Sequence, residues 1–490
     1  MHPTHLDVLI VGAGLSGIGA AALLQRELPG LRLAVLEARD APGGTWDLFR
    51  YPGMRSDSDM HTLGHRFRPW QGAHRTASGE AIRRYLDDTI AEHDLGRLIR
   101  LQHRVVGARW DDATALWHVD VEIGPERTRC TLQARFLYAC SGYYRMDQGH
   151  TPTWPGQADY TGRIVHPQHW PQDLAVAGQR VVVIGSGATA VTLVPALAAR
   201  GAQVTMLQRS PTYVEVRAGE SALARHLTRW LPAPLAGRLI RQARAARQVL
   251  VHRLSRRWPE AVRRHLLRGV AQALGPRQDL LVHFTPHYRP WDQRVCLAPN
   301  GDLFTALREG HAEVVTDTVD HFTPDGVALA SGRHLPADIV VTATGLDLLA
   351  LGGMTLTVND APVVLRRTFS HRGMMLAGVP NFAYAFGYTH ASWTLRAELA
   401  TEQVVRVLRH LRGTGLRRCM PRAPADLRTD RRLDFQPGYV LRNLHCFPKA
   451  GTQGPWRTPD NALLDRWRLR LAGLDDGALV FDNPAPRPAA

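Results

Sequence analysis

Glycine-rich turns stand at two places where the sequence could hold the phosphates of a dinucleotide. The first turn, 12–17, follows an apolar run over 7–11 and precedes an alanine-rich stretch that extends to about residue 28. In such a turn the first glycine permits a tight bend, the second admits a pyrophosphate to the backbone, and the third lets the helix pack closely on the strand. The residues of this turn predicted to contact a dinucleotide are Gly12, Gly14, Ser16 and Gly17.

An acidic residue supports this interpretation. Glu37 follows the next apolar run, 32–36, and lies 25 residues after Gly12. An acid at this place can accept hydrogen bonds from the 2′-hydroxyl of a ribose. A glycine-rich turn alone is weak evidence, because structural turns also match it. The complete unit predicts a dinucleotide site, because the turn is flanked by a strand and a helix and a second strand leads to an acid.

The same pattern returns over residues 180–210. An apolar run over 180–184 precedes a glycine-rich turn and a helical stretch to about 199, and a further apolar run, 203–207, leads to Arg209. A cation here would pair with a 2′-phosphate, so this unit is predicted to prefer NADPH to NADH. The alternative is that Arg209 is an ordinary surface arginine. The residues predicted to bind NADPH are Gly185, Ser186, Gly187, Ala188, Thr189, Arg209 and Ser210.

Parallel strands must position both turns. Each unit closes on an apolar run followed by small residues and a glycine, over 136–142 and 339–345. The repeat predicts an α/β fold with two nested Rossmann-like, three-layer dinucleotide-binding domains and a helical insertion. We expect an FAD-binding domain that begins with 1–150, an NADPH-binding domain over 151–345, and a return to the FAD domain over 346–490. One bound flavin and one exchanging nicotinamide indicate a flavoprotein oxidoreductase.

The composition narrows the class of oxidoreductase. Five cysteines are few and widely spaced, and no two form a Cys-x-x-Cys pair. This excludes a disulfide scaffold, a zinc ribbon and the dithiol centre of flavin disulfide reductases, and it suits a reducing, cytoplasmic setting. Residues 8–24 are apolar enough to resemble a signal sequence. The run is rich in glycine and no Lys or Arg precedes it, so we expect a strand, turn and helix there.

The linker between the two predicted domains, 160–171, carries a family motif. It reads YTGRIVHPQHWP and resembles the fingerprint of Baeyer–Villiger and related class B flavin monooxygenases. The matching residues are Gly162, His166 and Trp170, and Tyr160 stands where the family usually has Phe. The resemblance implies that His166 couples domain movement to cofactor position. A metal pair of His166 and His169 is the alternative, but no acid or cysteine lies nearby in sequence to complete a shell, so no metal is predicted.

The stretch 43–57, GGTWDLFRYPGMRSD, also carries the resemblance. Asp57 falls where the family has a buried active-site carboxylate. Arg294 matches the family's catalytic arginine, although without that match it would be interpreted as a surface arginine. The resemblance implies that Arg294 stabilises the oxygenated flavin and the tetrahedral intermediate, and that Asp57 orients it. The expected flavin contacts are Gly44, Thr45, Trp46, Asp47, Asp57 and Val105, and Arg55 is an expected NADP contact.

The resemblance covers about residues 5–470 and extends, through stretches such as VIGSGATAVTLVPAL, to the subgroup that activates a thioamide prodrug (ethionamide). It implies that NADPH reduces FAD, which then reacts with O2 to a C4a-peroxyflavin. This species would insert oxygen into ketones, giving esters or lactones, or oxygenate the sulfur of thioethers and thioamides. The alternatives are an NADPH-dependent flavin reductase or oxidase and an N-hydroxylating flavin monooxygenase. Close relatives tend to have Asn where this chain has His390, a difference that bears on substrate specificity.

The net charge of +16 is concentrated in one segment. Lysine occurs once, at Lys449, and residues 222–270 hold twelve arginines and a single acid, Glu260. We predict a helical insertion, about 215–285, whose arginines are solvated or rim the cofactor cleft. A second interpretation is peripheral contact with an anionic membrane through 222–270. Nucleic acid is not expected as a partner, because no nucleic-acid-binding motif accompanies the charge.

Overall fold

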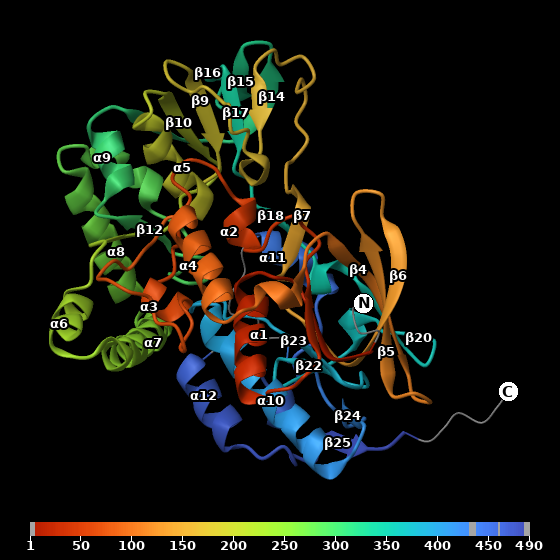
Figure 1. Ribbon diagram of the computed structural model, residues 1–490. Helices are drawn as coiled ribbons and strands as arrows, with labels where there is room; N and C mark the ends of the chain where they lie inside the picture. Colours follow the sequence, from red (N-terminus) through yellow and green to blue (C-terminus); the bar gives the residue numbers. More distant parts are fainter. Residues whose placement is uncertain (1–4, 431–437, 459–460, 485–490) are drawn as a thin grey trace.

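Two sheets, each at the centre of its own domain, organise the chain (Figure 1). The structure, a computed structural model, describes residues 5–430, 438–458 and 461–484. Parts of the predicted segment 346–490 therefore lie outside the described residues.

The larger sheet belongs to the first domain. Its order in the described residues is β20-β19-β4-β5-β6-β1-β2-β3, and β23 also pairs with β6. β1 runs parallel to β2 and β6, and it is apolar almost throughout because this part of the sheet is covered on both faces. The pairs β4–β5 and β5–β6 are antiparallel. The strands are β1 (His5–Val11), β2 (Leu33–Leu36), β3 (Ile99–Arg100), β4 (His103–Asp111), β5 (Leu116–Ile123), β6 (Thr128–Ala139), β19 (Thr355–Val358), β20 (Ala361–Pro362) and β23 (Phe382–Tyr384).

Two long helices pack beside this sheet. α1 (Leu15–Glu27) is buried from residue 17 to residue 24 and packs against α10 (Thr394–Thr414). Glycine and alanine make up most of the buried stretch 17–24 of α1, and the two helices share one apolar core with the sheet. The other helices of this domain are α2 (Thr45–Leu48), α3 (Met60–Leu63), α4 (Gly79–Glu92), α11 (Gly438–Asn443) and α12 (Ala462–Leu471).

The second sheet is parallel throughout its described length. Its order is β13-β10-β9-β17-β8, and α5 (Ala188–Ala198) follows β9 as the second glycine-rich pattern predicted. A separate parallel pair joins β11 (Val214–Arg217) to β12 (Cys296–Pro299). α9 (Asp302–Arg308) packs beside α5. The strands of the second sheet are β8 (Arg163–Val165), β9 (Arg180–Ile184), β10 (Gln203–Gln208), β13 (Ala312–Thr316) and β17 (Ile339–Thr342).

A two-stranded ladder joins the domains. The chain leaves the first domain through β7 (Tyr144–Gly149) and returns through β18 (Leu346–Leu348), and the two strands pair antiparallel. The second sheet is therefore inserted between two parts of the first. The predicted fold class, two nested Rossmann-like domains with a helical insertion, is confirmed.

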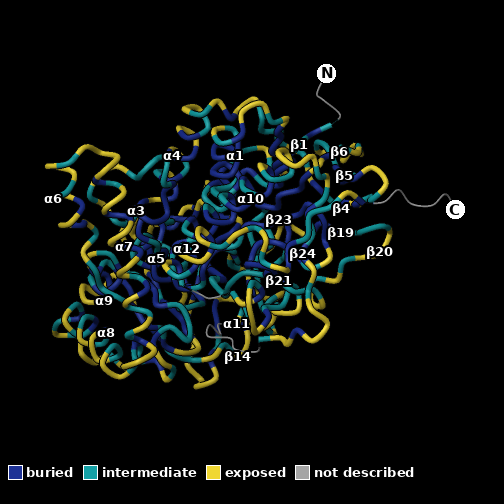
Figure 2. Tube along the Cα trace, turned by 90° about the horizontal axis from the view of Figure 1, so that it is seen from below, coloured by how far each residue is buried: buried dark blue, intermediate teal, exposed yellow. Residues whose placement is uncertain are grey.

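The basic segment forms α6 (Ala222–Trp230), α7 (Ala233–Arg257) and α8 (Pro259–Leu274). α6 is mostly exposed, whereas exposed residues alternate with intermediate and buried ones along α7 and α8 (Figure 2). The prediction that its arginines are solvated or rim the cofactor cleft is wrong for Arg241 and Arg244, which are 9% and 7% exposed. Arg241 pairs with Glu398 of α10, and Arg244 lies 3.5 Å from Asp59. A guanidinium can be buried where carboxylates meet it, so this side of α7 faces the first domain. No helix in the described ranges combines the length and apolarity that crossing a bilayer requires.

His65 is buried beside α1 and should make stability depend on pH. Its ring stacks on Phe67 with centroids 4.9 Å apart and packs against Gly19. Burial lowers the pKa of His65 from 6.5 to about 3. The folded chain therefore keeps this ring neutral, whereas the unfolded chain binds a proton below pH 6.5. The free energy of unfolding should fall as the pH drops from 6.5 toward 3, by up to about 1.4 kcal/mol per pH unit from this group.

Melting temperatures measured from pH 7 to pH 4.5 test this expectation. His65→Gln removes the titrating ring, so its melting temperature should fall less steeply below pH 6.5 than that of the wild type. The exposed His74 supplies the control variant His74→Gln, which should follow the wild-type curve. Parallel curves for His65→Gln and wild type would contradict the prediction.

Candidate active site

A cavity of about 1320 Å³ lies between the two domains. Both glycine-rich turns contribute to its walls, together with residues of the segments 43–58, 140–147 and 384–396. Pockets for single drug-sized ligands are typically about 300–1,000 Å³. The space therefore suits a dinucleotide together with a second molecule.

The first turn has the backbone geometry that a pyrophosphate needs. Gly12 has a φ of +101°, and a Cβ atom there would lie 2.7 Å from the carbonyl oxygen of Cys140. A Cβ at Gly17 would lie 1.8 Å from the carbonyl oxygen of Gly12. No side chain among the described residues caps the start of α1, so its first N–H groups can donate to a phosphate. Gly14 and Ser16 line the cavity at this point.

Glu37 lines the same end of the cavity. Its Oε2 atom accepts a hydrogen bond from the Ala13 N–H at 2.8 Å, and Oε1 accepts one from the Arg39 N–H at 3.0 Å. Burial raises the pKa of this carboxyl, against these hydrogen bonds. Each oxygen keeps a lone pair after these contacts, so the carboxylate can both hold the turn and accept from a ribose hydroxyl. These residues fit the adenosine end of FAD.

The residues that follow β2 differ in whether they line the cavity. Gly44, Thr45, Trp46 and the more distant Val105 line the cavity, as expected for flavin contacts. Asp47 does not, because its buried carboxylate pairs with Arg39 at 2.8 Å and with Arg50 at 2.6 Å. Arg39 in turn donates to the carbonyl of Gly44 at 3.1 Å. Asp47 supports the cavity wall through Arg39, and its contact with the flavin stays a prediction.

Arg294 and Asp57 meet in the cavity. Nη1 of Arg294 lies 3.0 Å from Oδ2 of Asp57, although 237 residues separate them in sequence. Arg294 lies two residues before the start of β12, and Asp57 belongs to the first domain. The Asp57 carboxylate raises the pKa of Arg294 above its usual value, while burial acts in the opposite direction. The structure thus fixes a permanent cation, 42% exposed, at the cavity wall.

Aromatic side chains lie close to this pair, and the sequence analysis did not single out Tyr143 or Tyr439. Tyr143 stacks on Trp393 with centroids 5.1 Å apart, and the Trp393 indole donates to Ser16 Oγ at 2.7 Å. Tyr143 and Tyr439 lie close enough to Arg294 to affect its charge equilibrium. Burial raises the pKa of both phenols, so they stay neutral. The sequence CSGYY contains Tyr143, but no local pattern places it beside a residue of the other domain.

The second turn meets the cavity only through residues that follow its glycines. A Cβ at Gly185 would lie 2.3 Å from the carbonyl oxygen of Ala343, and α5 starts without a side-chain cap among the described residues. Ala188 and Thr189 line the cavity. Ser186 bonds to Thr212 at 2.7 Å, and Gly187 faces open space. Ser210 is exposed, as is Arg209, which has no carboxylate partner in the described part of the chain.

Arg55 joins the two domains. Its Nη1 atom lies 2.5 Å from Oδ2 of Asp302 at the start of α9. Its Nη2 atom is buried and has no hydrogen-bond partner in the described ranges. The residue lines the cavity, so the guanidinium edge left over can donate to a nucleotide, as the sequence predicted for NADP.

The linker residues lie outside the cavity wall. The ring of His166 fills the space beside Gly149 of β7, where a Cβ would come within 2.0 Å of it, and burial lowers the pKa of His166. Trp170 is buried in the core of the second domain. A Cβ at Gly162 would lie 2.5 Å from the carbonyl oxygen of Asp338. His166 therefore packs on the strand through which the chain leaves the first domain.

His390 is not among the residues that line the cavity. Its neighbours Thr389 and Ala391 line the wall, but the buried His390 ring stacks on His252 of α7 with centroids 3.7 Å apart. Its bearing on substrate specificity stays a prediction.

Known proteins share this fold. A family model described as an NAD(P)-binding Rossmann-like domain matches residues 10–78, and one described as flavin-binding monooxygenase-like matches residues 77–229. A solved steroid monooxygenase bound to NADP matches with a TM-score of 0.75 at 19% identity, over 98% of this chain and 100% of that chain. A cyclohexanone monooxygenase bound to ε-caprolactone matches with a TM-score of 0.68 at 21% identity, over 85% and 90%.

Relatives of higher identity extend over nearly the full length. The FAD-containing monooxygenase EthA of Mycobacterium tuberculosis is 48% identical over 485 residues, which cover 98% of this chain and 99% of the relative. The probable FAD-binding monooxygenase AlmA of Acinetobacter baylyi is 43% identical over 98% of this chain and 96% of the relative. This chain therefore belongs to the family of FAD-containing monooxygenases.

Proposed function

We propose that this protein uses FAD, NADPH and O2 to oxygenate ketones and organosulfur compounds in the cavity between its two domains. The observation that carries the proposal is the Arg294–Asp57 pair, which stands in a space lined by both glycine-rich turns. A simple nucleotide reductase has no need of a fixed cation at that place. The family membership and the fold shared with a cyclohexanone monooxygenase support the same conclusion.

FAD in this cavity would supply a hydride acceptor for NADPH and, once reduced, a reaction centre for O2. The first turn and Glu37 would hold its adenosine and pyrophosphate. Asp57 holds Arg294 in place, and Arg294 stabilises negative charge that develops on oxygen during transfer. Tyr143 and Trp393 cover the cavity wall with aromatic surface and exclude water, which limits loss of the activated oxygen as hydrogen peroxide.

The chemistry of the wall favours neutral substrates. Arg294 can stabilise the oxyanion formed when a ketone carbonyl is attacked, which leads to an ester or lactone. A thioether or thioamide sulfur is itself a nucleophile and needs no such charge, so the same cavity can serve both classes.

The proposal is tested by following NADPH oxidation in air with and without a simple ketone or thioether. We expect substrate to increase NADPH oxidation and to yield ester or sulfoxide. NADPH oxidation that yields hydrogen peroxide alone with every substrate would identify a reductase or oxidase instead. Oxygenation of amines alone would favour an N-hydroxylating enzyme.

Arg209 should determine the choice between the two nicotinamide nucleotides. Arg209 is exposed and directly follows β10, the position at which a Rossmann domain contacts the 2′-phosphate of NADPH. Arg209→Ala should reduce the ratio of kcat/KM for NADPH to that for NADH about 10- to 100-fold, because a charge-assisted bond is lost with NADPH alone. Steady-state kinetics with both nucleotides measure the ratio. Arg200→Ala, at an exposed position of the same domain, is the control, and an unaltered ratio in Arg209→Ala would remove Arg209 from the nucleotide site.

A further inference from the structure

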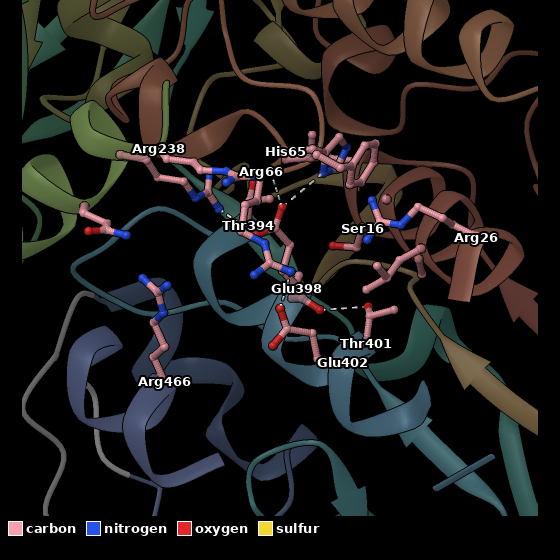
Figure 3. A pocket seen from close by; sticks show the side chains of 18 residues that line it. Ser16, Arg26, His65, Arg66, Arg238, Thr394, Glu398, Thr401, Glu402 and Arg466 are labelled. Atoms are coloured by element: carbon pink, nitrogen blue, oxygen red, sulfur yellow. Dashed lines mark hydrogen bonds and ion pairs between the residues drawn. The ribbon is translucent and has the colours of Figure 1, made fainter. Parts of the chain in front are cut away.

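A second cavity, of about 510 Å³, lies between α1, α7, α10 and α12 (Figure 3). Apolar residues of α1 and α10 form one part of its wall. Charged residues form another part: Arg26, Arg66, Arg238, Arg241, Arg466, Glu398 and Glu402. The oxygenation proposed above uses none of these side chains.

The two glutamates of this cavity are already paired. Glu398 lies 2.8 Å from Arg241 and also accepts the Arg66 N–H at 2.6 Å. Glu402 lies 2.7 Å from Arg66 and 2.9 Å from Arg470. Their charges are therefore compensated within the protein, and the remaining charge of the cavity wall is positive.

Arg26 pairs with Glu27 at 3.0 Å, so Arg238 and Arg466 account for the remaining excess. Neither has a carboxylate partner within the described residues. In Figure 3 the Arg466 side chain rises from α12 into the space beside α7, the helix that carries Arg238. Burial lowers the pKa of Arg466, and the charges of Arg470 and Arg66 act in the same direction. An anion bound between Arg238 and Arg466 would relieve this repulsion, and phosphate oxygens match the geometry of guanidinium groups.

Exposed apolar side chains lie on the same two helices as these arginines. Trp467 and Leu471 of α12 are 63% and 68% exposed, and with Leu463 they form a stripe at a spacing of four residues. On α7, Leu235 and Leu239 flank Arg238 and are 45% and 41% exposed. Leucine and tryptophan interspersed with arginine are typical of helices that lie in the interface of an anionic bilayer. A soluble anion would need the arginines but not this surrounding apolar surface.

We propose that this cavity binds the phosphate of an anionic lipid headgroup, and that the exposed faces of α7 and α12 rest on the membrane around it. Arg238 and Arg466 hold the phosphate from two helices. Trp467, Leu471 and the leucines of α7 enter the region between headgroups and acyl chains. The inference does not depend on the oxygenation reaction, since it concerns a different cavity and is measured without turnover.

Co-sedimentation of the full-length protein with vesicles tests the proposal. At low salt the wild type should sediment with phosphatidylglycerol vesicles. With phosphatidylcholine vesicles it should stay in the supernatant. Arg238→Gln/Arg466→Gln should weaken binding about 25-fold, because each arginine near an anionic surface contributes about fivefold. Trp467→Ser should weaken it as well. Melting temperature and bound-flavin absorbance of each variant show whether it is folded.

A matched control separates the cavity from diffuse charge. Arg109→Gln/Arg129→Gln also removes two positive charges, but from exposed positions on β4 and β6. These strands lie on the side of the molecule away from α7 (Figure 1). This variant should bind vesicles like the wild type. Equal losses in both double variants would overturn the proposal, as would wild-type binding that Arg238→Gln/Arg466→Gln leaves unchanged. The proposal would also be overturned if inorganic phosphate raised the melting temperature of the wild type while the protein bound no vesicles. That result would indicate a soluble phosphate as the ligand.

Discussion

Arg294→Ala should abolish oxygen transfer and leave flavin reduction intact. The guanidinium is the permanent cation that Asp57 fixes at 3.0 Å in the cavity between the domains. Removing one group that stabilises developing negative charge typically lowers kcat about 10²- to 10³-fold. We expect a loss of this size in ester formation. The rate at which NADPH bleaches the flavin without oxygen should change far less, because Arg294 is outside both glycine-rich turns.

Product yield per NADPH consumed is the measurement that matters for this variant. NADPH consumed in air should appear as hydrogen peroxide instead of ester. Arg289→Ala is the matched control, since Arg289 is exposed, precedes Arg294 by five residues and does not line the cavity. An unchanged yield in Arg294→Ala would refute the role given to this residue.

Arg241→Met should be among the most destabilising substitutions in the molecule. The buried guanidinium donates to the carbonyl groups of Thr62 and Gly64 and pairs with Glu398 at 2.8 Å. Its removal leaves a nearly buried carboxylate without that partner. Breaking one side of a buried ion pair typically costs about 3–5 kcal/mol.

Thermal unfolding compares this variant with a neighbour on the same helix. Arg238→Met lies one turn earlier on α7, is exposed and should change stability by about 0.5 kcal/mol or less. Arg241→Met should melt at a clearly lower temperature and lose the contact between α7 and α10 first. Equal melting temperatures for the two variants would show that the buried contacts of Arg241 contribute little.

Local patterns predicted the two nucleotide-binding units well. The predicted strand over 180–184 coincides with β9, and the predicted helix to about residue 28 ends one residue earlier, with Glu27. These units are short and their turns depend on neighbouring glycines, so nearby sequence specifies them. The antiparallel strands β4 and β5 were not predicted. The sheet was recognised from its parallel strands, which are continuously apolar, whereas β4 and β5 alternate between apolar and polar residues.

Contacts between the domains could not be predicted from local sequence. Arg294 and Asp57 were brought together only by a family resemblance, since nothing in either segment indicates the other. For the same reason, the ion pair of Arg55 with Asp302 and the stacking of His390 on His252 were not predicted. Arginines on a helix are ordinarily solvated, so the burial of Arg241 and Arg244 also escaped prediction. Each of these contacts depends on a partner surface far away in sequence.

The pairing of β7 with β18 places both ends of the second domain next to each other. Leu346 lies opposite Gly149, and Leu348 lies opposite Tyr144. A gene segment encoding roughly the residues between these strands could therefore be exchanged among relatives as a cassette, because its two ends need only meet at one ladder. Recombination at this point would exchange the second glycine-rich turn together with Arg294, while it preserves the first domain with Asp57.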